Sequence, residues 1–301
     1  MNDDLGPWDV PADTIVVGLD ATDAWQATVD WAAEEAVLEG RDITLVHAAD
    51  ATEELWHDTG GRDVRIGVKE SPTVPELLLD RARARVGRRA PGVTVHGVLR
   101  GGNVRQVLHG AAQDAHLLVV GSRRHRTTWS RLFGTHGSAV ARRPPCPVVV
   151  VHAGHPGLVH RGVLVGVDDS EHSQQALQFA LRQGSLRQLP VTVLHVAPEP
   201  VAAGSSLEVV EEQLHLAEAM AGVRETYPDV HIETMLAQGE PAAALLRAGR
   251  RMNLIVVGAH HGRTVSDVLL GSVVAPVVER AACPVAVVPD SPHPDPARRT
   301  P

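Results

Sequence analysis

The sequence predicts an α/β fold of two repeated domains, each an open five-stranded parallel sheet with helices on both faces. The chain repeats itself: TIVVGLDAT at 14–22 matches GVLVGVDDS at 162–170, and LLVVGSRRHRTTWSRLFGT at 117–135 matches LIVVGAHHGRTVSDVLLGS at 254–272. Each copy also alternates β-branched apolar runs with stretches of helical spacing. Alternating strands and helices joined by right-handed crossovers form a parallel sheet covered by helices.

The spacing between matching residues indicates one duplication with one insertion. Asp168 follows Asp20 by 148 positions, whereas Cys283 follows Cys146 by 137 positions. Both offsets are constant over several motifs. The first copy therefore carries about eleven extra residues in one connection within 50–75, where loops tolerate insertions.

The elements of the first copy follow from its pattern and its capping residues. Thr22 or Asp23 is a natural N-cap for the first helix, Pro72 suits a first helical turn, and Asn103 is a natural N-cap for a third helix. Strands are expected at 14–20, 43–49, 93–99, 116–121 and 147–151, and helices at 23–39, from Pro72 to about Arg89, from Asn103 to about Gln113 and from Thr135 to about Arg143. In the second copy, strands are expected near 162–168, 191–197, 230–236, 254–258 and 285–288.

Composition limits the class of protein. The 301 residues suffice for two domains, and the apolar content of 44% supports two cores built from aliphatic side chains, since only 3% of residues are aromatic. A net charge of −8 argues against a general nucleic-acid binder. No apolar stretch approaches the length of a membrane span, and the N-terminus lacks a signal pattern, so we expect a cytoplasmic protein without a membrane partner. The expected limits are domain 1 at 1–153, a linker at 154–160, domain 2 at 161–290 and a disordered tail at 291–301.

The loop after each fourth strand has the features of a phosphate cradle. Gly121 and Gly134 are 13 residues apart, as are Gly258 and Gly271, and a hydroxyl residue follows the second glycine in each copy. Unpaired N–H groups and the helix dipole favour an anion at such a helix start. Ligands of open parallel sheets bind beyond the carboxyl ends of the strands, where these loops and Asp20 and Asp168 are expected.

These motifs resemble the universal stress protein family, present here as a tandem. The resemblance covers both glycine loops, the Val-Gly-x-Asp ends of the first strands, the second-strand endings with His47 and His195, and the Cys-Pro-Val final strands. It implies a Rossmann-like fold of the adenine nucleotide alpha hydrolase type, ATP as ligand, with Mg²⁺ as a possible companion ion, and two copies paired through their final strands. It also implies a further homodimer.

The resemblance assigns roles to particular residues. The aspartates would bind a ribose hydroxyl or the adenine edge, although a helix cap or turn is the alternative role of an Asp at this position. The valines on the second strands would flank adenine, and the hydroxyl residues would bind phosphate. The assigned positions are Asp20, Val46, Gly121, Arg124, Gly134 and Thr135 in the first copy, and Asp168, Val196, Gly258, His261, Gly271, Ser272 and Val273 in the second.

Both copies depart from the family at one position. The family has a middle glycine in the loop, where this chain has Arg124 and His261. A Cβ there hinders close backbone approach to phosphate, whereas either side chain offers a cationic contact to an anion. We expect an ATP-binding stress regulator with an unidentified protein partner. The alternatives are a scaffold that has lost the nucleotide and, third, a weak ATPase.

The remaining reactive side chains give little support to catalysis or a metal site. The chain contains no P-loop, zinc-protease or nucleophile-elbow motif. Both cysteines are expected to be buried core residues. His152, His155 and His160 are expected in the linker, where ligands are rarely held in place.

Overall fold

The computed structural model describes residues 10–20, 24–49, 74–122, 144–152, 161–168, 173–197, 225–259 and 271–289. The elements of the first half are β1 (Ile15–Leu19), α1 (Trp25–Glu39), β2 (Ile43–Ala49), α2 (Val74–Arg89), β3 (Val95–Gly101), α3 (Val104–Ala111), β4 (Leu117–Ser122) and β5 (Val148–His152). Those of the second half are β6 (Val163–Val167), α5 (Ser173–Arg187), β7 (Val191–Ala197), β8 (Ile232–Gln238), α7 (Pro241–Ala248), the 3₁₀ turn η3 (Gly249–Arg251), β9 (Leu254–Gly258), α8 (Gly271–Arg280) and β10 (Val285–Val288). Within these ranges, every helix is too short or too polar to span a lipid bilayer.

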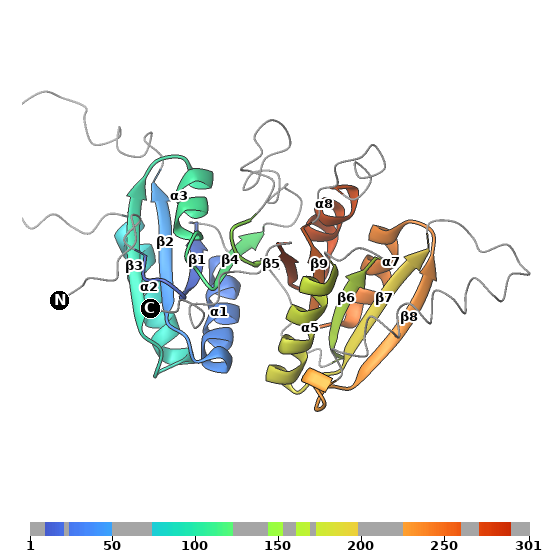
Figure 1. The fold of residues 1–301 in the computed structure, drawn as a ribbon. Helices are drawn as coiled ribbons and strands as arrows, with labels where there is room; N and C mark the ends of the chain where they lie inside the picture. The colour runs from blue at the N-terminus through green and yellow to red at the C-terminus, as the bar shows by residue number, and fades with distance from the viewer. Residues whose placement is uncertain are drawn as a thin grey trace, which may run out of the picture.

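The ten strands of the described residues form one sheet, in the order β3-β2-β1-β4-β5-β10-β9-β6-β7-β8 (Figure 1). Within each half the pairs are parallel, as the βαβ pattern predicts. The halves meet at β5 and β10, which run antiparallel with Val149 opposite Ala286. These two residues are equivalent in the repeat, because their numbers differ by 137, so an approximate two-fold axis passes between them. The expected pairing of the two copies through their final strands is confirmed.

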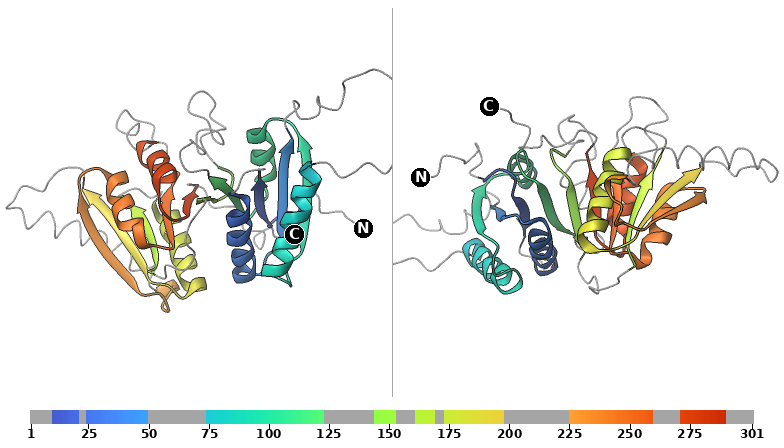
Figure 2. Two further views of the ribbon diagram at one scale, coloured as in Figure 1. Left: turned by 180° about the vertical axis from the view of Figure 1, so that it is seen from behind. Right: turned by 60° about the horizontal axis from the view of Figure 1, so that its bottom comes forward.

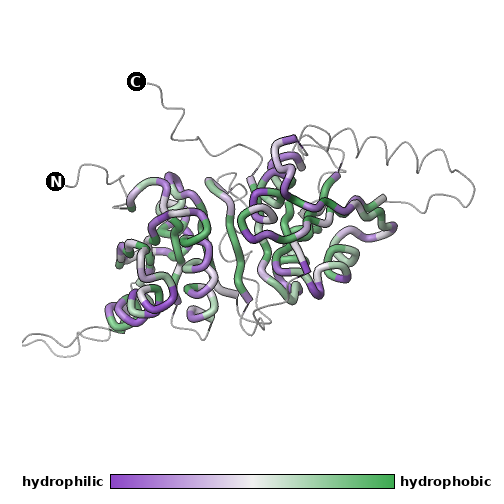
Figure 3. The backbone as a smooth tube through the Cα atoms, turned by 90° about the horizontal axis from the view of Figure 1, so that it is seen from below, coloured by the Kyte–Doolittle hydropathy of each residue, from purple (hydrophilic) through white to green (hydrophobic). Residues whose placement is uncertain are grey.

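Helices cover both faces of the sheet, as the further views in Figure 2 show. Helices α1, α2 and α5 pack on one face, and α3, α7 and α8 pack on the other. Each face has a single core that includes residues of both halves. Strands β5 and β10 are buried along their whole length, which fits strands covered on both sides. Figure 3 shows a mainly hydrophobic segment at the middle of the molecule.

Most described elements lie where the sequence predicts them, with three corrections. The helix expected from Thr135 to about Arg143 lies outside the described residues. Helix α1 begins after Ala24, which makes no side-chain capping bond, so the expected Thr22 or Asp23 N-cap is wrong. Strands β3 and β8 lie two residues later than 93–99 and 230–236. His152 is not in a linker: it ends β5, is buried, and its Nε2 donates to the Val278 carbonyl at 2.7 Å.

Candidate functional site

The strand order places both candidate aspartates at a switch point of the sheet. In the first half β1 lies between β2 and β4, and the exposed Asp20 leaves the carboxyl end of β1 next to the end of β4. In the second half β6 lies between β7 and β9, and the exposed Asp168 leaves β6 next to the end of β9. Strand order reverses at these two places, and open α/β sheets bind ligands in the crevice that results.

Asp168 is held by the helix that follows it. The Ser173 hydroxyl, in the first turn of α5, lies 2.9 Å from Asp168 Oδ1 and 2.7 Å from its carbonyl oxygen. Asp168 therefore forms hydrogen bonds within its own turn, which is the alternative role expected for an Asp at this position. The residue is nevertheless exposed to solvent. A ligand hydroxyl would meet an acceptor whose orientation is already fixed.

A buried histidine supports the neighbouring strand end in the first half. His47 of β2 donates from Nδ1 to the Leu19 carbonyl oxygen at 3.0 Å, just before Asp20. Its equivalent His195 is equally buried, at the same position of β7. The histidine thus ties the ends of β1 and β2 together and fixes where Asp20 leaves the sheet.

Gly121 has a packing role at the end of β4. A Cβ at this position would lie 2.7 Å from Thr28 Oγ1 and 3.2 Å from the Ala24 Cβ, so only glycine lets the start of α1 approach so closely. Gly121 and Gly258 are not among the described glycines with positive φ, so neither is a left-handed turn. Gly102 and Gly239 do have positive φ, at equivalent turns after β3 and β8.

The two valines assigned to adenine occupy different positions. Val46 is completely buried in β2, opposite Gly18 and Val98, and its equivalent in the second half is Leu194. Val196 is half-buried, two residues further along β7. Both belong to the face covered by α3, α7 and α8, but only Val196 is near the carboxyl end of its strand.

Of the two predicted phosphate cradles, the structure describes only the helix start that closes the second one. Gly271 and Ser272 form the start of α8, as expected, and Val273 is half-buried against the core. Arg124, Gly134, Thr135 and His261 lie outside the described residues.

This edge of the sheet has further polar and turn residues that the sequence motifs do not mark. Ser122, the last residue of β4, is buried, and the turns containing Gly102 and Gly239 reach the same edge of the sheet. Arg100 and Arg105 flank the first of these turns, where the second half has Ala237 and Ala242. Aligning the two copies reveals this difference.

The cysteines do not contribute reactive groups. Cys146 and Cys283 are buried and free, and burial raises the pKa of each thiol to about 12. Both therefore stay protonated and unreactive near neutral pH. Within the described ranges, no three His, Cys, Asp or Glu side chains are grouped so as to hold a metal ion.

Comparison with known proteins gives a consistent result. The model of the universal stress protein family matches residues 11–152 and 160–289. A universal stress protein of Mycolicibacterium smegmatis is 31% identical over 91% of this chain and 96% of its own length, and one of Mycobacterium tuberculosis is 31% identical over 92% and 96%. The crystal structure of a universal stress protein from Archaeoglobus fulgidus has the same fold, with a TM-score of 0.57 at 18% identity over 92% of this chain and 96% of that one. Two family matches, one in each half, agree with the duplicated fold: the chain belongs to the universal stress protein family.

Proposed function

We propose that this protein binds ATP at the carboxyl edge of its sheet, in one or both halves, and acts in the cytoplasm as a stress-response regulator rather than as a catalyst. One observation carries the proposal. Each half places an exposed aspartate, Asp20 or Asp168, at a switch point of the sheet, beside the strand that contains the first glycine of the predicted cradle, Gly121 in β4 or Gly258 in β9. In the second half, the loop after β9 leads to the N-terminus of α8, where N–H groups and the helix dipole favour phosphate.

The arrangement suits binding better than chemistry. Asp168 is an oriented hydrogen-bond acceptor for a ribose hydroxyl or an adenine amine. The two thiols are too deeply buried to act as nucleophiles. Any Mg²⁺ would be carried by the nucleotide phosphates. The protein would form a homodimer, act on an unidentified protein partner, and consist of one domain at 1–153 and a second at 161–290.

The first experiment is to denature the purified protein and measure the mass and amount of the released nucleotide. About two ATP per chain supports binding in both halves, and about one supports a single site. If no nucleotide is released and calorimetry with added ATP is flat, the ATP proposal is wrong and the nucleotide-free scaffold replaces it.

Variants locate the site in the second half. Gly271→Glu places a carboxylate at the start of α8 and should abolish ATP binding there. Asp168→Ala should weaken binding by at least about tenfold, because a hydrogen bond to a charged group contributes roughly 1.5–3 kcal/mol. Val74→Glu, at an exposed residue of α2, adds the same charge elsewhere and should leave the affinity unchanged. Unaltered ATP affinity in Gly271→Glu would eliminate the second-half site.

A further inference from the structure

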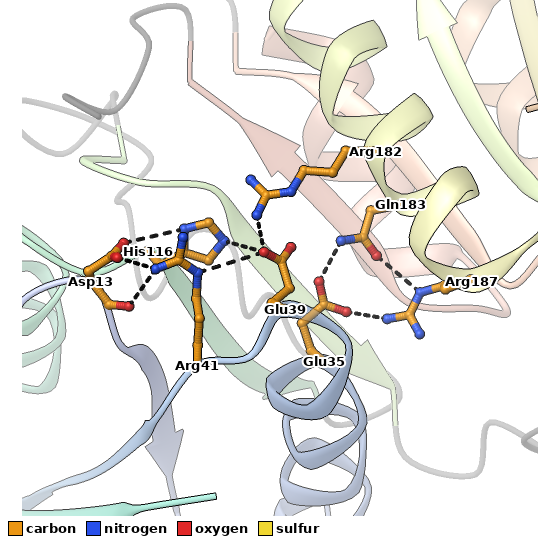
Figure 4. Close-up of polar contacts among 8 residues, drawn as sticks. All are labelled: Asp13, Glu35, Glu39, Arg41, His116, Arg182, Gln183 and Arg187. Atoms are coloured by element: carbon orange, nitrogen blue, oxygen red, sulfur yellow. Dashed lines mark hydrogen bonds and ion pairs between the residues drawn. The ribbon is translucent and has the colours of Figure 1, made fainter. Parts of the chain in front are cut away.

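The first helices of the two halves face each other across the approximate two-fold axis. Glu35 of α1 accepts a hydrogen bond from the Gln183 side chain of α5 (Figure 4). These residues are equivalent in the repeat, because their numbers differ by 148. In a two-fold interface, a residue on the axis meets its own equivalent. The Glu35–Gln183 contact therefore lies on the same axis as the Val149–Ala286 pair of the sheet.

The two helices differ in charge at the positions that meet. Glu35 and Glu39 of α1 have side chains that are 0% and 1% exposed. Arg187 forms an ion pair with Glu35, and Arg182 forms one with Glu39. The equivalents of Glu34, Glu35 and Glu39 in the second half are Arg182, Gln183 and Arg187. The first half contributes carboxylates and the second half contributes their cationic and amide partners.

Each polar group of the axis contact has a partner. Arg187 Nε donates to Gln183 Oε1 at 3.0 Å, so one carboxylate, one amide and one guanidinium form a closed set. The Arg187 guanidinium also lies 5.4 Å from the ring centre of Trp31, on the opposing helix. Buried charges are tolerated only when they are paired and hydrogen-bonded in this way.

Glu39 is anchored from its own half as well. His116 Nε2 lies 3.1 Å from Glu39 Oε2, and Arg41 Nε lies 3.7 Å from the same oxygen. Burial alone would raise the pKa of Glu39, but the hydrogen bond and charge of His116 and the charge of Arg182 outweigh burial and lower it. Glu39 therefore stays charged and keeps its requirement for the arginine of the other half.

We propose that the α1–α5 surface is a selective pairing surface, which accepts the second domain and rejects a second copy of the first. If the first domain paired with itself, Glu35 would meet another Glu35 at the axis. Both copies of Glu35 and Glu39 would also lose Arg187 and Arg182. If the second domain paired with itself, its arginines would lack the opposing carboxylates. Only a first domain paired with a second domain gives both buried carboxylates, Glu35 and Glu39, an arginine from the opposing helix.

The test uses the full chain and substitutes Glu35 and Gln183, the two axis residues, whose side chains have nearly the same shape. Gln183→Glu recreates, within one chain, the Glu–Glu contact that two first domains would make at the axis, while Arg187 stays in place. Two carboxylates then share Arg187, and amide hydrogen exchange in α1 and α5 should become at least about tenfold faster, as expected when a buried charge loses its partner. Gln178→Glu, the same change at an exposed position of α5, is the matched control and should leave exchange unchanged.

The swapped double variant separates charge pairing from simple packing. Glu35→Gln with Gln183→Glu again gives one carboxylate, one amide and Arg187, so exchange should return to within about threefold of the wild-type rate. If Gln183→Glu has no effect, or if the swap is as damaging as Gln183→Glu alone, the proposal is overturned.

Should Gln183→Glu fail to fold, substitutions of Arg182, at the solvent-exposed edge of the α1–α5 surface, provide a second and less disruptive test. The side chain of Arg182 is 42% exposed, so substitutions there are easier to accommodate. Exchange in α1 should accelerate from the wild type to Arg182→Gln and again to Arg182→Glu, which brings a like charge to Glu39. Equal rates for the two variants would contradict a surface that selects its partner by charge.

Discussion

The interior of the sheet and the facing surfaces of α1 and α5 have diverged differently between the two halves. The interior keeps the same residue at many equivalent positions, such as Leu117 and Leu254, His47 and His195, and Cys146 and Cys283. The facing helices instead replace Glu35 and Glu39 with Gln183 and Arg187. A buried strand must meet the same packing requirement in each half. A residue on the axis meets its own equivalent, so a buried charge there requires the two halves to differ.

The largest expected effects test the similarity of the two interiors. Leu117 and Leu254 are each 1% exposed, at equivalent positions of β4 and β9. Leu117→Ala and Leu254→Ala should each lower the free energy of unfolding by about 2–5 kcal/mol, because each leaves a cavity in the core. Urea unfolding measures both values, and Val37→Ala, at an exposed residue of α1, serves as the near-neutral control. A cost below about 1 kcal/mol for either leucine would show that the two interiors are not equivalent.

The sequence predicts buried strands better than edge strands. The limits of β2, β7, β9 and β10 agree with the predicted ones, because dense β-branched runs mark them. Strands β3 and β8 are sheet edges with partly exposed residues, so their apolar pattern is weak, and pairing with β2 and β7 sets their limits.

The candidate site could be predicted only in part. The ends of β1 and β6 follow from the motif, so Asp20 and Asp168 lie where expected. The α1–α5 contacts could not be predicted from helical spacing, because each carboxylate contacts a side chain of the other half that lies more than 140 positions away. The signal was present in the aligned copies, as a reversal of charge at equivalent positions.

A smaller effect concerns pH and sharpens the contrast at the interface. Burial raises the pKa of Glu35 from 4.5 to about 7, with a further increase from Glu39, against the lowering effects of Arg187 and Gln183. A carboxyl with a raised pKa in the folded state contributes stability that is complete below its unfolded pKa and is lost as pH rises through about 7. The wild type should therefore lose up to about 3 kcal/mol of stability relative to Glu35→Gln between about pH 4 and about pH 8.

Urea unfolding of the wild type and of Glu35→Gln across this pH range measures their difference in stability. The contributions of the other titrating groups are common to both proteins and cancel in that difference. A difference that does not change with pH would show that Glu35 keeps an ordinary pKa. A change of opposite sign would show that its ion pair with Arg187 outweighs burial.

The smallest expected effects lie at two helix starts that use different residues for one task. Asn103 caps α3 by accepting from the Arg105 N–H at 3.0 Å, and its equivalent Glu240 caps α7 by accepting from Ala242 and Ala243 N–H groups at 2.9 and 2.6 Å. Asn103→Ala and Glu240→Ala should each cost about 1 kcal/mol in urea unfolding. Glu240→Asn should retain most of that stability, and a loss equal to that of Glu240→Ala would mean that the carboxylate charge, rather than the cap, is required.

Joining β5 to β10 within one chain changes how pairing depends on concentration. Two separate domains would associate in a bimolecular equilibrium, and dilution would separate them. Here the partner is covalently attached, so its effective concentration is fixed by the chain itself and reaches the millimolar range for short flexible connections. The paired state should therefore be as complete in a cell that contains few copies of this protein as in one that contains many.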